Sequence, residues 1–337
     1  MRIANTVTIR RATGACLAAL LLGLSCSWAV AAPRAGDRVL LLSTRPVGCT
    51  TSAEKLSLGA YAAELHAGGG CCDWQEAPAA DLLGSLDPGK PIVFYVHGNQ
   101  IDPGMARRRG LDVYRRFICC ARDDRPIQFV TFSWCSAKVR GPLKDYRVKA
   151  ARTRPVAAQL AWVIGRLPDK AAVGLIGYSY GARVSSGAAH LLEGGSLSGL
   201  RSPERLSEKR LRAVFLAAAF DAGWLGPACY HGRAMRSFES LLVTVNPCDP
   251  AMRFYKLVPR GSDPDALGGV GPICLSADYA SRITKRRVSG SVGRSHDLYA
   301  YLASPGLMRT AWDRLTFSDS PYADRTADAS PTDLRSR

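Results

Sequence analysis

A serine in a short turn flanked by glycines is the residue of this chain best suited to nucleophilic chemistry. The turn, Gly177-Tyr178-Ser179-Tyr180-Gly181, follows an apolar run rich in β-forming residues and precedes a segment with helical character. Side chains two positions before and after the serine would collide in so sharp a turn, which explains Gly177 and Gly181. A strand before this motif and a helix after it are the context that the motif requires. The sequence therefore predicts a strained turn that lifts the Ser179 hydroxyl above the edge of a sheet.

Three histidines follow Ser179 and could take the proton that makes its hydroxyl a nucleophile. His190 lies in the helix after the serine, about 16 Å along its axis at 1.5 Å per residue, and His231 lies in an irregular stretch. His296 follows the last candidate strand, and loops at the carboxyl ends of parallel strands are where such a site gathers its residues. We predict that His296 is the base; the alternative is a surface histidine at a helix start.

Two aspartates at strand ends could orient that base. Asp249 directly follows the apolar run 241–245, and Asp221 directly follows the run 211–220. Either aspartate keeps the chain order serine, acid, histidine, so the residues alone leave both open. Each could instead be a turn residue whose carboxylate hydrogen-bonds its own backbone.

Acyl transfer through a serine also needs two backbone N–H groups aimed at the charge that develops on the carbonyl oxygen. One comes from the residue after the nucleophile, here Tyr180. The loop after the strand 91–96 offers the other, because Gly98 allows a close backbone approach and Asn99 can donate its N–H. His97 precedes the nucleophile and is expected to be structural, tying loops together.

These motifs stand in the order that is found in the α/β-hydrolase superfamily, which the chain resembles over residues 91–315. The resemblance rests on His97-Gly98-Asn99, the turn around Ser179, Asp249 and His296. It implies the α/β-hydrolase fold, with a mostly parallel central sheet and helices on both faces. The superfamily's acid most often follows the later of the two strands, so the resemblance favours Asp249 and leaves Asp221 as the alternative acid. It also implies a triad that acts without metal or cofactor.

A closer resemblance is to an uncharacterised exported bacterial branch of this superfamily, through Phe132-Ser133-Trp134-Cys135-Ser136 and Asp145-Tyr146-Arg147. That branch usually has proline where Cys135 stands and often histidine where Tyr178 stands, and neither departure touches the triad. The activity implied is that of an esterase or lipase-like serine hydrolase acting on an ester, thioester or amide of a small-molecule or lipid-like substrate. Two alternatives stay open: a non-catalytic envelope binding protein that retains the fold, and an acyltransferase.

Alternating apolar strands and helices predict one α/β domain over residues 36–317. Fully apolar strands joined by helical crossovers indicate a parallel sheet covered on both faces. Residues 44–89 are expected to hold loops, a short helix and one further strand, and 261–271 a loop. The expected strands are 38–43, 91–96, 127–134, the run before Ser179, 211–220, 241–245 and one within 283–292. The expected helices begin after the N-cap Asp102, span 145–167, run from the nucleophile to 192, and run from 296 to 315.

The first 31 residues have the features of a cleaved export signal. Arg2, Arg10 and Arg11 precede an apolar stretch over 15–29, and Ala29-Val30-Ala31 fits a cleavage site. The apolar stretch is too short to favour a membrane span, so no stable membrane anchor is expected. We predict export to the periplasm, cell envelope or medium. Residues 318–337 are rich in Ser, Asp, Thr and Pro and are expected to be a disordered tail.

The chain is strongly basic. Its formal net charge is +17, and loss of the three arginines in the signal lowers it to +14. Clusters such as Arg107-Arg108-Arg109 and Lys285-Arg286-Arg287 are best explained as solvated surface, with at most weak attraction to anionic surfaces. No nucleic-acid-binding motif accompanies them, so no nucleic-acid partner is expected.

Cysteine spacing favours disulfides over a metal site. Two of the 11 cysteines lie in the signal, and nine lie in the mature chain. The adjacent pairs Cys71-Cys72 and Cys119-Cys120 do not have the spacing of zinc ligands. We expect structural disulfides of unassigned pairing together with buried thiols, since an odd number leaves at least one cysteine unpaired.

Overall fold

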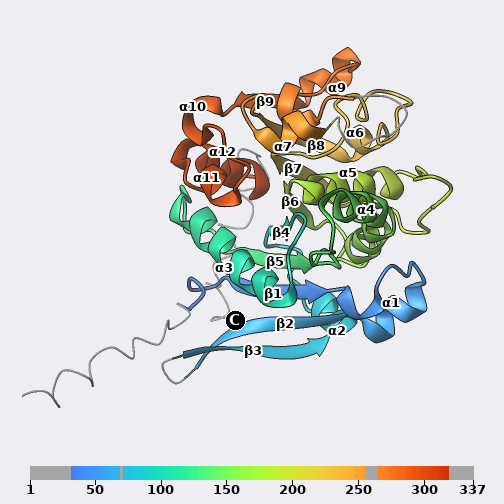
Figure 1. Cartoon of the computed structure of the whole chain (residues 1–337). Helices are drawn as coiled ribbons and strands as arrows, with labels where there is room; N and C mark the ends of the chain where they lie inside the picture. The colour runs from blue at the N-terminus through green and yellow to red at the C-terminus, as the bar shows by residue number, and fades with distance from the viewer. Residues whose placement is uncertain (1–31, 69–70, 256–263, 319–337) are drawn as a thin grey trace, which may run out of the picture.

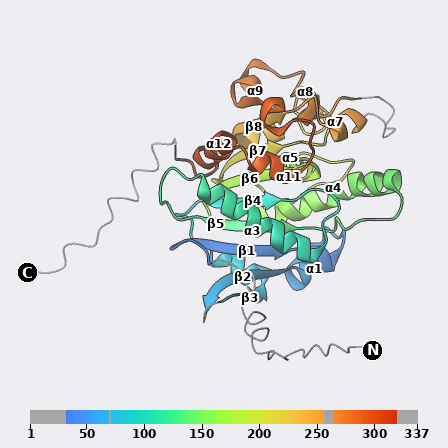
Figure 2. The ribbon, with the colours of Figure 1, turned by 60° about the vertical axis from the view of Figure 1, so that its left-hand side comes forward.

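A nine-stranded, mostly parallel sheet organises the computed structural model, which describes residues 32–68, 71–255 and 264–318. The strand order is β3-β2-β1-β5-β4-β6-β7-β8-β9, and both views show the strands stacked from β3 at the bottom towards β8 near the top (Figure 1 and Figure 2). All neighbours from β1 to β9 in this order are parallel, whereas β2 and β3 add antiparallel pairings at one edge. The strands are β1 (Arg38–Ser43), β2 (Tyr61–Gly68), β3 (Cys71–Pro78), β4 (Ile92–Val96), β5 (Gln128–Ser133), β6 (Ala172–Tyr178), β7 (Arg210–Leu216), β8 (Phe238–Val245) and β9 (Ile283–Arg287).

Helices cover both faces of the sheet and give the domain two hydrophobic layers. In Figure 1, α3, α11 and α12 lie on one side of the sheet, and α4 and α5 lie on the other. No helix in the described ranges is long and apolar enough to cross a membrane. The helices are η1 (Arg45–Val47), α1 (Ala53–Gly59), α2 (Ala79–Gly84), α3 (Pro103–Cys119), α4 (Pro142–Gly165), α5 (Tyr180–Leu192), α6 (Ala234–Ser237), α7 (Pro250–Phe254), α8 (Leu267–Val270), α9 (Ala277–Ser281), α10 (Ser289–Val292), α11 (Leu298–Leu302) and α12 (Pro305–Leu315).

The strand order reverses direction between β5 and β6, which sets the place of the site. The chain passes from β4 to β5 on one side of β4 and then returns to β6 on its other side. All five residues of β4 are fully buried, as the continuous apolar run predicts for a strand covered on both faces. In parallel sheets, such a reversal opens a crevice beyond the carboxyl ends of the strands. The loops after β4 and β6 meet at that crevice.

Several predicted elements are confirmed, and others end at different residues. The strand over 38–43 is β1, and α3 begins after Asp102, whose Oδ1 accepts a 2.7 Å hydrogen bond from Met105 N. The strand expected over 211–220 ends at Leu216 instead, because Ala217 adopts a left-handed φ of 47°. The helix expected over 145–167 begins earlier, at Pro142, whose ring suits a first helical turn.

The C-terminal elements are shorter than the apolar pattern suggested. The strand expected within 283–292 is β9 and stops at Arg287, after which α10 forms. The single helix expected over 296–315 is divided into α11 and α12. Pro305 has no N–H for a continuous helix and instead occupies the first turn of α12. Part of the loop expected over 261–271 forms α8, while residues 256–263, the signal over 1–31 and the tail beyond residue 318 lie outside the described residues.

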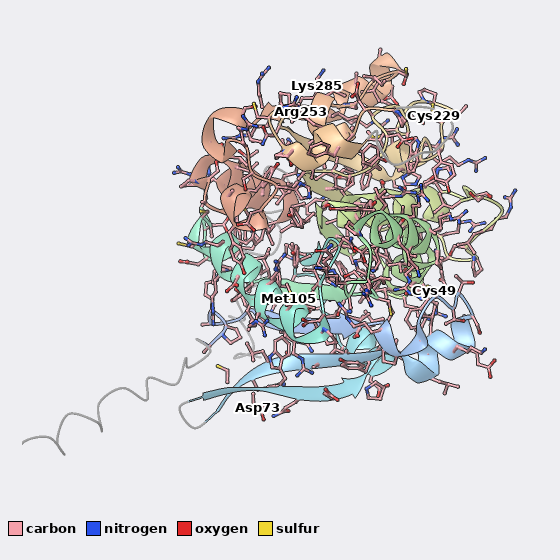
Figure 3. The ribbon with its side chains drawn as sticks, viewed as in Figure 1. Cys49, Asp73, Met105, Cys229, Arg253 and Lys285 are labelled. Atoms are coloured by element: carbon pink, nitrogen blue, oxygen red, sulfur yellow. The ribbon has the colours of Figure 1, made fainter. Side chains whose placement is uncertain are left out.

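The stretch 44–89 contains two strands rather than one. β2 and β3 pair in antiparallel register from Tyr61 opposite Pro78 to Gly68 opposite Cys71. This pairing makes β3 one edge of the sheet, and β9 is the other edge. Figure 3 labels one charged residue on each of these edges, Asp73 on β3 and Lys285 on β9.

The cysteines do not form the expected disulfides among the residues whose side chains are described. Eight cysteines are free, and each is exposed or partly exposed, so the expectation of buried thiols is also wrong for them. Cys49 and Cys229 lie in well-separated parts of the molecule in Figure 3. Cys119 and Cys120 are neighbours at the end of α3, where consecutive side chains project in different directions.

The close packing of α3 on β5 makes a testable prediction. A Cβ at Gly110 would collide with Thr131 Oγ1 and lie 2.9 Å from Thr131 Cβ. Overpacking costs about 1–3 kcal/mol, whereas alanine gains roughly 1 kcal/mol over glycine in helix propensity. Gly110→Ala should therefore lower the free energy of unfolding in urea titrations, and should cost less when Thr131→Ala is also present. An equal cost in both backgrounds would contradict this packing.

Candidate active site

Ser179 lies at the tip of a strained turn between β6 and α5. Its backbone has φ 54° and ψ −118°, a region that residues other than glycine rarely adopt. A Cβ at Gly177 would lie 2.6 Å from Ala182 Cα, and one at Gly181 would collide with the Val96 carbonyl oxygen. Ser179 N donates to the Leu216 carbonyl at 2.9 Å, which fastens the turn to the end of β7. Both glycines are therefore needed for the reason that the motif implied.

Ser179, His296 and Asp249 form one hydrogen-bonded chain. His296 Nε2 lies 3.2 Å from Ser179 Oγ, and His296 Nδ1 lies 2.7 Å from Asp249 Oδ2. Asp249 is fully buried, whereas the His296 side chain is 29% exposed. A buried carboxylate on Nδ1 leaves Nε2 to face the serine hydroxyl, which is the arrangement that a general base requires.

The loops that carry the acid and the base are tied to each other and to the turn at Ser179. Asp249 caps α7, because its Oδ1 accepts from Ala251 N at 2.8 Å. Asn246 Nδ2 donates to the Gly293 carbonyl at 2.9 Å and so joins the loop after β8 to the loop that holds His296. Tyr178 Oη donates to the His296 carbonyl. The loop that carries His296 is therefore tied both to the loop after β8 and to the turn at Ser179.

The alternative acid Asp221 lies elsewhere. Its Oδ1 accepts a 2.5 Å hydrogen bond from Tyr255 Oη, and its backbone forms a β-bridge with Ala266. The hydrogen-bond partners of the His296 ring are Asp249 and Ser179. Of the two aspartates, the structure thus brings only Asp249 to the histidine.

The loop after β4 lies directly against the turn at Ser179. A Cβ at Gly98 would be 3.1 Å from Ser179 Cβ and 3.1 Å from Tyr178 Cδ1, so the backbones approach closely there. Asn99 and Tyr180, the two residues predicted to supply the oxyanion hole, both line the cavity above Ser179. Tyr180 is the first residue of α5, where backbone N–H groups point out of the helix end.

A buried ion pair on α4 holds this loop, a role that the sequence did not predict. Asp145 Oδ2 accepts from Asn99 Nδ2 at 2.7 Å and from Gln100 Nε2 at 3.2 Å, while Asp145 Oδ1 accepts from Lys149 Nζ at 2.7 Å. Asp145 and Lys149 are both fully buried. Burial opposes the charge on Asp145, but the hydrogen bonds from Lys149, from the Val139 N–H and from both amides hold its pKa below the usual value. An i,i+4 acid–lysine pair was the available sequence signal.

His97 is a structural histidine, as its position before the nucleophile suggested. It is fully buried and stacks on Trp134 with the ring centroids 5.6 Å apart. Trp134 N donates to His97 Nε2 at 3.2 Å, and Trp134 Nε1 donates to the His97 carbonyl at 2.9 Å. Burial, reinforced by the charge of Arg45, lowers the pKa of His97 to about 3. The ring is therefore neutral and ties the loop after β4 to the end of β5.

The two other histidines after Ser179 have structural partners. His190 Nε2 lies 3.0 Å from Ser196 N, and its Nδ1 lies 3.2 Å from Arg233 N. His231 is buried, and its Nδ1 lies 2.7 Å from Ser186 Oγ. Burial lowers the pKa of both histidines. Neither ring is therefore placed to act as the base for Ser179, as the ring of His296 is.

A cavity of about 570 Å³ opens above Ser179 and His296. It is bounded by the loop after β4, by α3 and α4, and by α7; Figure 3 labels Met105 on α3 and Arg253 on α7. Within the described ranges, no cluster of three or more His, Cys, Asp or Glu side chains could hold a metal ion. The lining residues are Asn99, Gln100, Met105, Arg109, Leu143, Tyr146, Tyr178, Ser179, Tyr180, Ala219, Ala251, Met252, Phe254, Tyr255 and His296.

Comparison with known proteins adds no relative. No protein-family model, no curated protein and no solved structure matches the chain. Function must therefore be argued from the geometry of the site itself.

The buried neutral state of His97 predicts a pH effect on stability. An unfolded histidine binds a proton near pH 6.5, whereas folded His97 does so only near pH 3. The unfolded state therefore gains a proton that the folded state excludes, and stability falls as the pH drops from about 6.5 towards 3. For His97 alone the loss between pH 6.5 and 4.5 is about 2 kcal/mol.

Urea unfolding of the wild type and His97→Gln at several pH values measures this loss. The wild type should lose about 2 kcal/mol more than the variant over that range. Parallel curves for the two proteins would show that His97 is not held neutral by the fold.

Proposed function

We propose that the protein is a serine hydrolase of the α/β-hydrolase type that cleaves an ester, thioester or amide through an acyl-enzyme. The main support is the hydrogen-bonded chain of Ser179, His296 and Asp249 at the carboxyl edge of a mostly parallel sheet. The serine–histidine contact is 3.2 Å and the histidine–aspartate contact is 2.7 Å. The strained turn between β6 and α5 supports the same proposal, because it presents the serine hydroxyl to the cavity.

In the first half-reaction, Ser179 Oγ attacks the substrate carbonyl carbon while His296 Nε2 accepts the hydroxyl proton. Asp249 accepts the Nδ1–H hydrogen bond and stabilises the imidazolium that forms. When the tetrahedral intermediate collapses, the bond to the leaving group breaks, and His296 returns the proton to that group. Water then attacks the acyl-enzyme with His296 again as base, which frees the acid and restores Ser179.

The oxyanion is proposed to accept hydrogen bonds from the backbone N–H groups of Tyr180 and Asn99. The close approach of Gly98 to Ser179 supports this, since it brings the loop after β4 beside the reacting carbonyl. Preorganised donors of this kind supply a large share of catalysis, because they need not reorient as charge develops. The Asp145 hydrogen bonds fix Asn99 before substrate arrives.

The cavity favours a substrate with an apolar part. Met105, Leu143, Met252 and Phe254 all line it, and its volume of about 570 Å³ is that of a small-molecule site. A small-molecule or lipid-like ester is therefore proposed as the substrate. Export is proposed from residues 1–31 of the sequence alone.

Ser179→Ala should abolish hydrolysis of p-nitrophenyl esters, because the nucleophile is lost. The expected fall in kcat is roughly 10³-fold or more. A fluorophosphonate probe should label the wild type and the surface control Ser198→Ala, but not Ser179→Ala. Equal background rates in the wild type and Ser179→Ala, with no labelling, would instead favour a non-catalytic binding protein. Competing alcohols in the same assay would reveal acyl transfer.

Asn99→Ala tests the proposed oxyanion hole. The substitution keeps the backbone N–H but removes the 2.7 Å tether to Asp145. kcat should fall roughly 10- to 100-fold, with a smaller change in KM, because the N–H acts mainly in the transition state. Gln100→Ala should have a smaller effect, since Gln100 is exposed and its contact is 3.2 Å. Unchanged kcat in Asn99→Ala would show that the Asp145 tether is not needed to position this N–H.

A further inference from the structure

The cavity above Ser179 contains a cation that the proposed mechanism does not use. Arg109, on α3, is the only lysine or arginine among the described lining residues, and none of them is an aspartate or glutamate. Apart from His296, the other described lining residues have uncharged side chains. Among the described lining residues, no carboxylate therefore balances the charge of Arg109.

Arg109 is half-buried and makes no hydrogen bond or ion pair with any residue in the described ranges. Its neighbours on α3 differ, because Arg107 pairs with Glu76 at 3.0 Å and Arg115 lies 3.9 Å from Asp112. Asp112, one turn beyond Arg109, instead accepts from Tyr299 Oη at 2.7 Å. A partly desolvated guanidinium without a carboxylate partner is a site where a bound anion recovers lost hydration.

The charge of Arg109 acts on the part of the cavity next to the base. Burial raises the pKa of Tyr178; the charge of Arg109 opposes that rise, and the charge of Asp297 adds to it. Tyr178 also lines the cavity, and its ring centroid lies 5.6 Å from that of His296. An anion bound by Arg109 would thus lie inside the same cavity as the scissile bond.

The mouth of the cavity is apolar. Leu143, Tyr146 and Phe254 line it and are exposed to 57%, 40% and 63%. Large exposed apolar side chains gathered at one opening mark a binding surface for an apolar group. The site thus combines an apolar entrance with one arginine among its described lining residues.

We propose that the substrate is an ester that carries both an apolar chain and an anionic group, a carboxylate or a phosphate, and that Arg109 binds this anion. The inference rests on the proposed hydrolase function. The net charge, +14 without the three arginines of the proposed signal, supports it, because a basic protein attracts anionic substrates and raises their rate of encounter.

The test compares matched ester pairs that differ only in the anion. The acyl arm uses the mono-p-nitrophenyl ester of suberic acid against p-nitrophenyl octanoate. The alcohol arm uses 1-octanoylglycerol 3-phosphate against 1-octanoylglycerol. Each pair is assayed with the wild type, with Arg109→Met, and with Arg108→Met. The last variant loses the same charge from an exposed neighbour that does not line the cavity.

The wild type should prefer the anionic member of at least one pair by roughly 10-fold or more in kcat/KM. Arg109→Met should remove that preference, because kcat/KM falls more for the anionic ester than for the neutral one. Arg108→Met should keep the preference. The pair that responds identifies whether the anion lies on the acyl or the alcohol side.

Two outcomes would overturn the inference without touching the hydrolase function: Ser179-dependent hydrolysis with no anionic preference, or a preference that survives in Arg109→Met. If no ester is hydrolysed, the hydrolase proposal fails, and anion binding is still measured by calorimetry. Suberate monomethyl ester should then bind to Ser179→Ala more tightly than methyl octanoate, and the difference should vanish when Arg109→Met is added. Equal binding of both esters would refute the role of Arg109.

Discussion

The backbone of Ser179 is the constraint on which the site depends. A φ of 54° with ψ −118° costs about 1–3 kcal/mol for a residue that is not glycine. This backbone conformation persists because hydrogen bonds to neighbouring segments hold it. Ser179 N donates to Leu216, and the Ser179 carbonyl accepts from Ala182 N at 3.1 Å and from Ala219 N at 3.3 Å. The end of β7 and the start of α5 thus hold the serine in position, and the left-handed turn at Ala217 ends β7 where these bonds are needed.

A buried charge network around Asp145 and Lys149 likewise fixes the position of the loop after β4. Desolvating Asp145 and Lys149 is expensive, and such pairs add little net stability, but breaking one by removing a single partner is strongly destabilising. The pair is compensated by donors from three segments: the 2.7 Å bond from Val139 N, the amides of Asn99 and Gln100, and Lys149 itself. A loop without regular structure thereby acquires a defined position beside Ser179, which apolar packing alone, being non-directional, would not supply.

The sequence predicted the central strands and the meeting of Ser179 with His296, because apolar runs and strand-end residues are local signals. The residues alone did not decide whether Asp249 or Asp221 is the acid, since both follow strands. Tertiary contacts distinguish the two aspartates, because Tyr255 binds Asp221. The hairpin of β2 and β3 was not foreseen in full, because its alanines have weak β-propensity and its pairing is decided by neighbouring strands. The buried Lys149 was also hidden, since a lysine in a helix ordinarily faces water.

The two edges of the sheet carry opposite charge, and this bears on how copies of the chain meet. β9 reads Ile-Thr-Lys-Arg-Arg, with Lys285 and Arg287 exposed, whereas β3 carries Asp73 and Glu76. Strand edges have unpaired N–H and C=O groups that can template pairing with another molecule. Two β9 edges brought together would set lysines and arginines opposite one another, and two β3 edges would do the same with carboxylates, which cross-strand repulsion disfavours. Each edge of the sheet therefore resists pairing with the same edge of another copy, whereas the opposite charges leave β3-to-β9 contact without that repulsion.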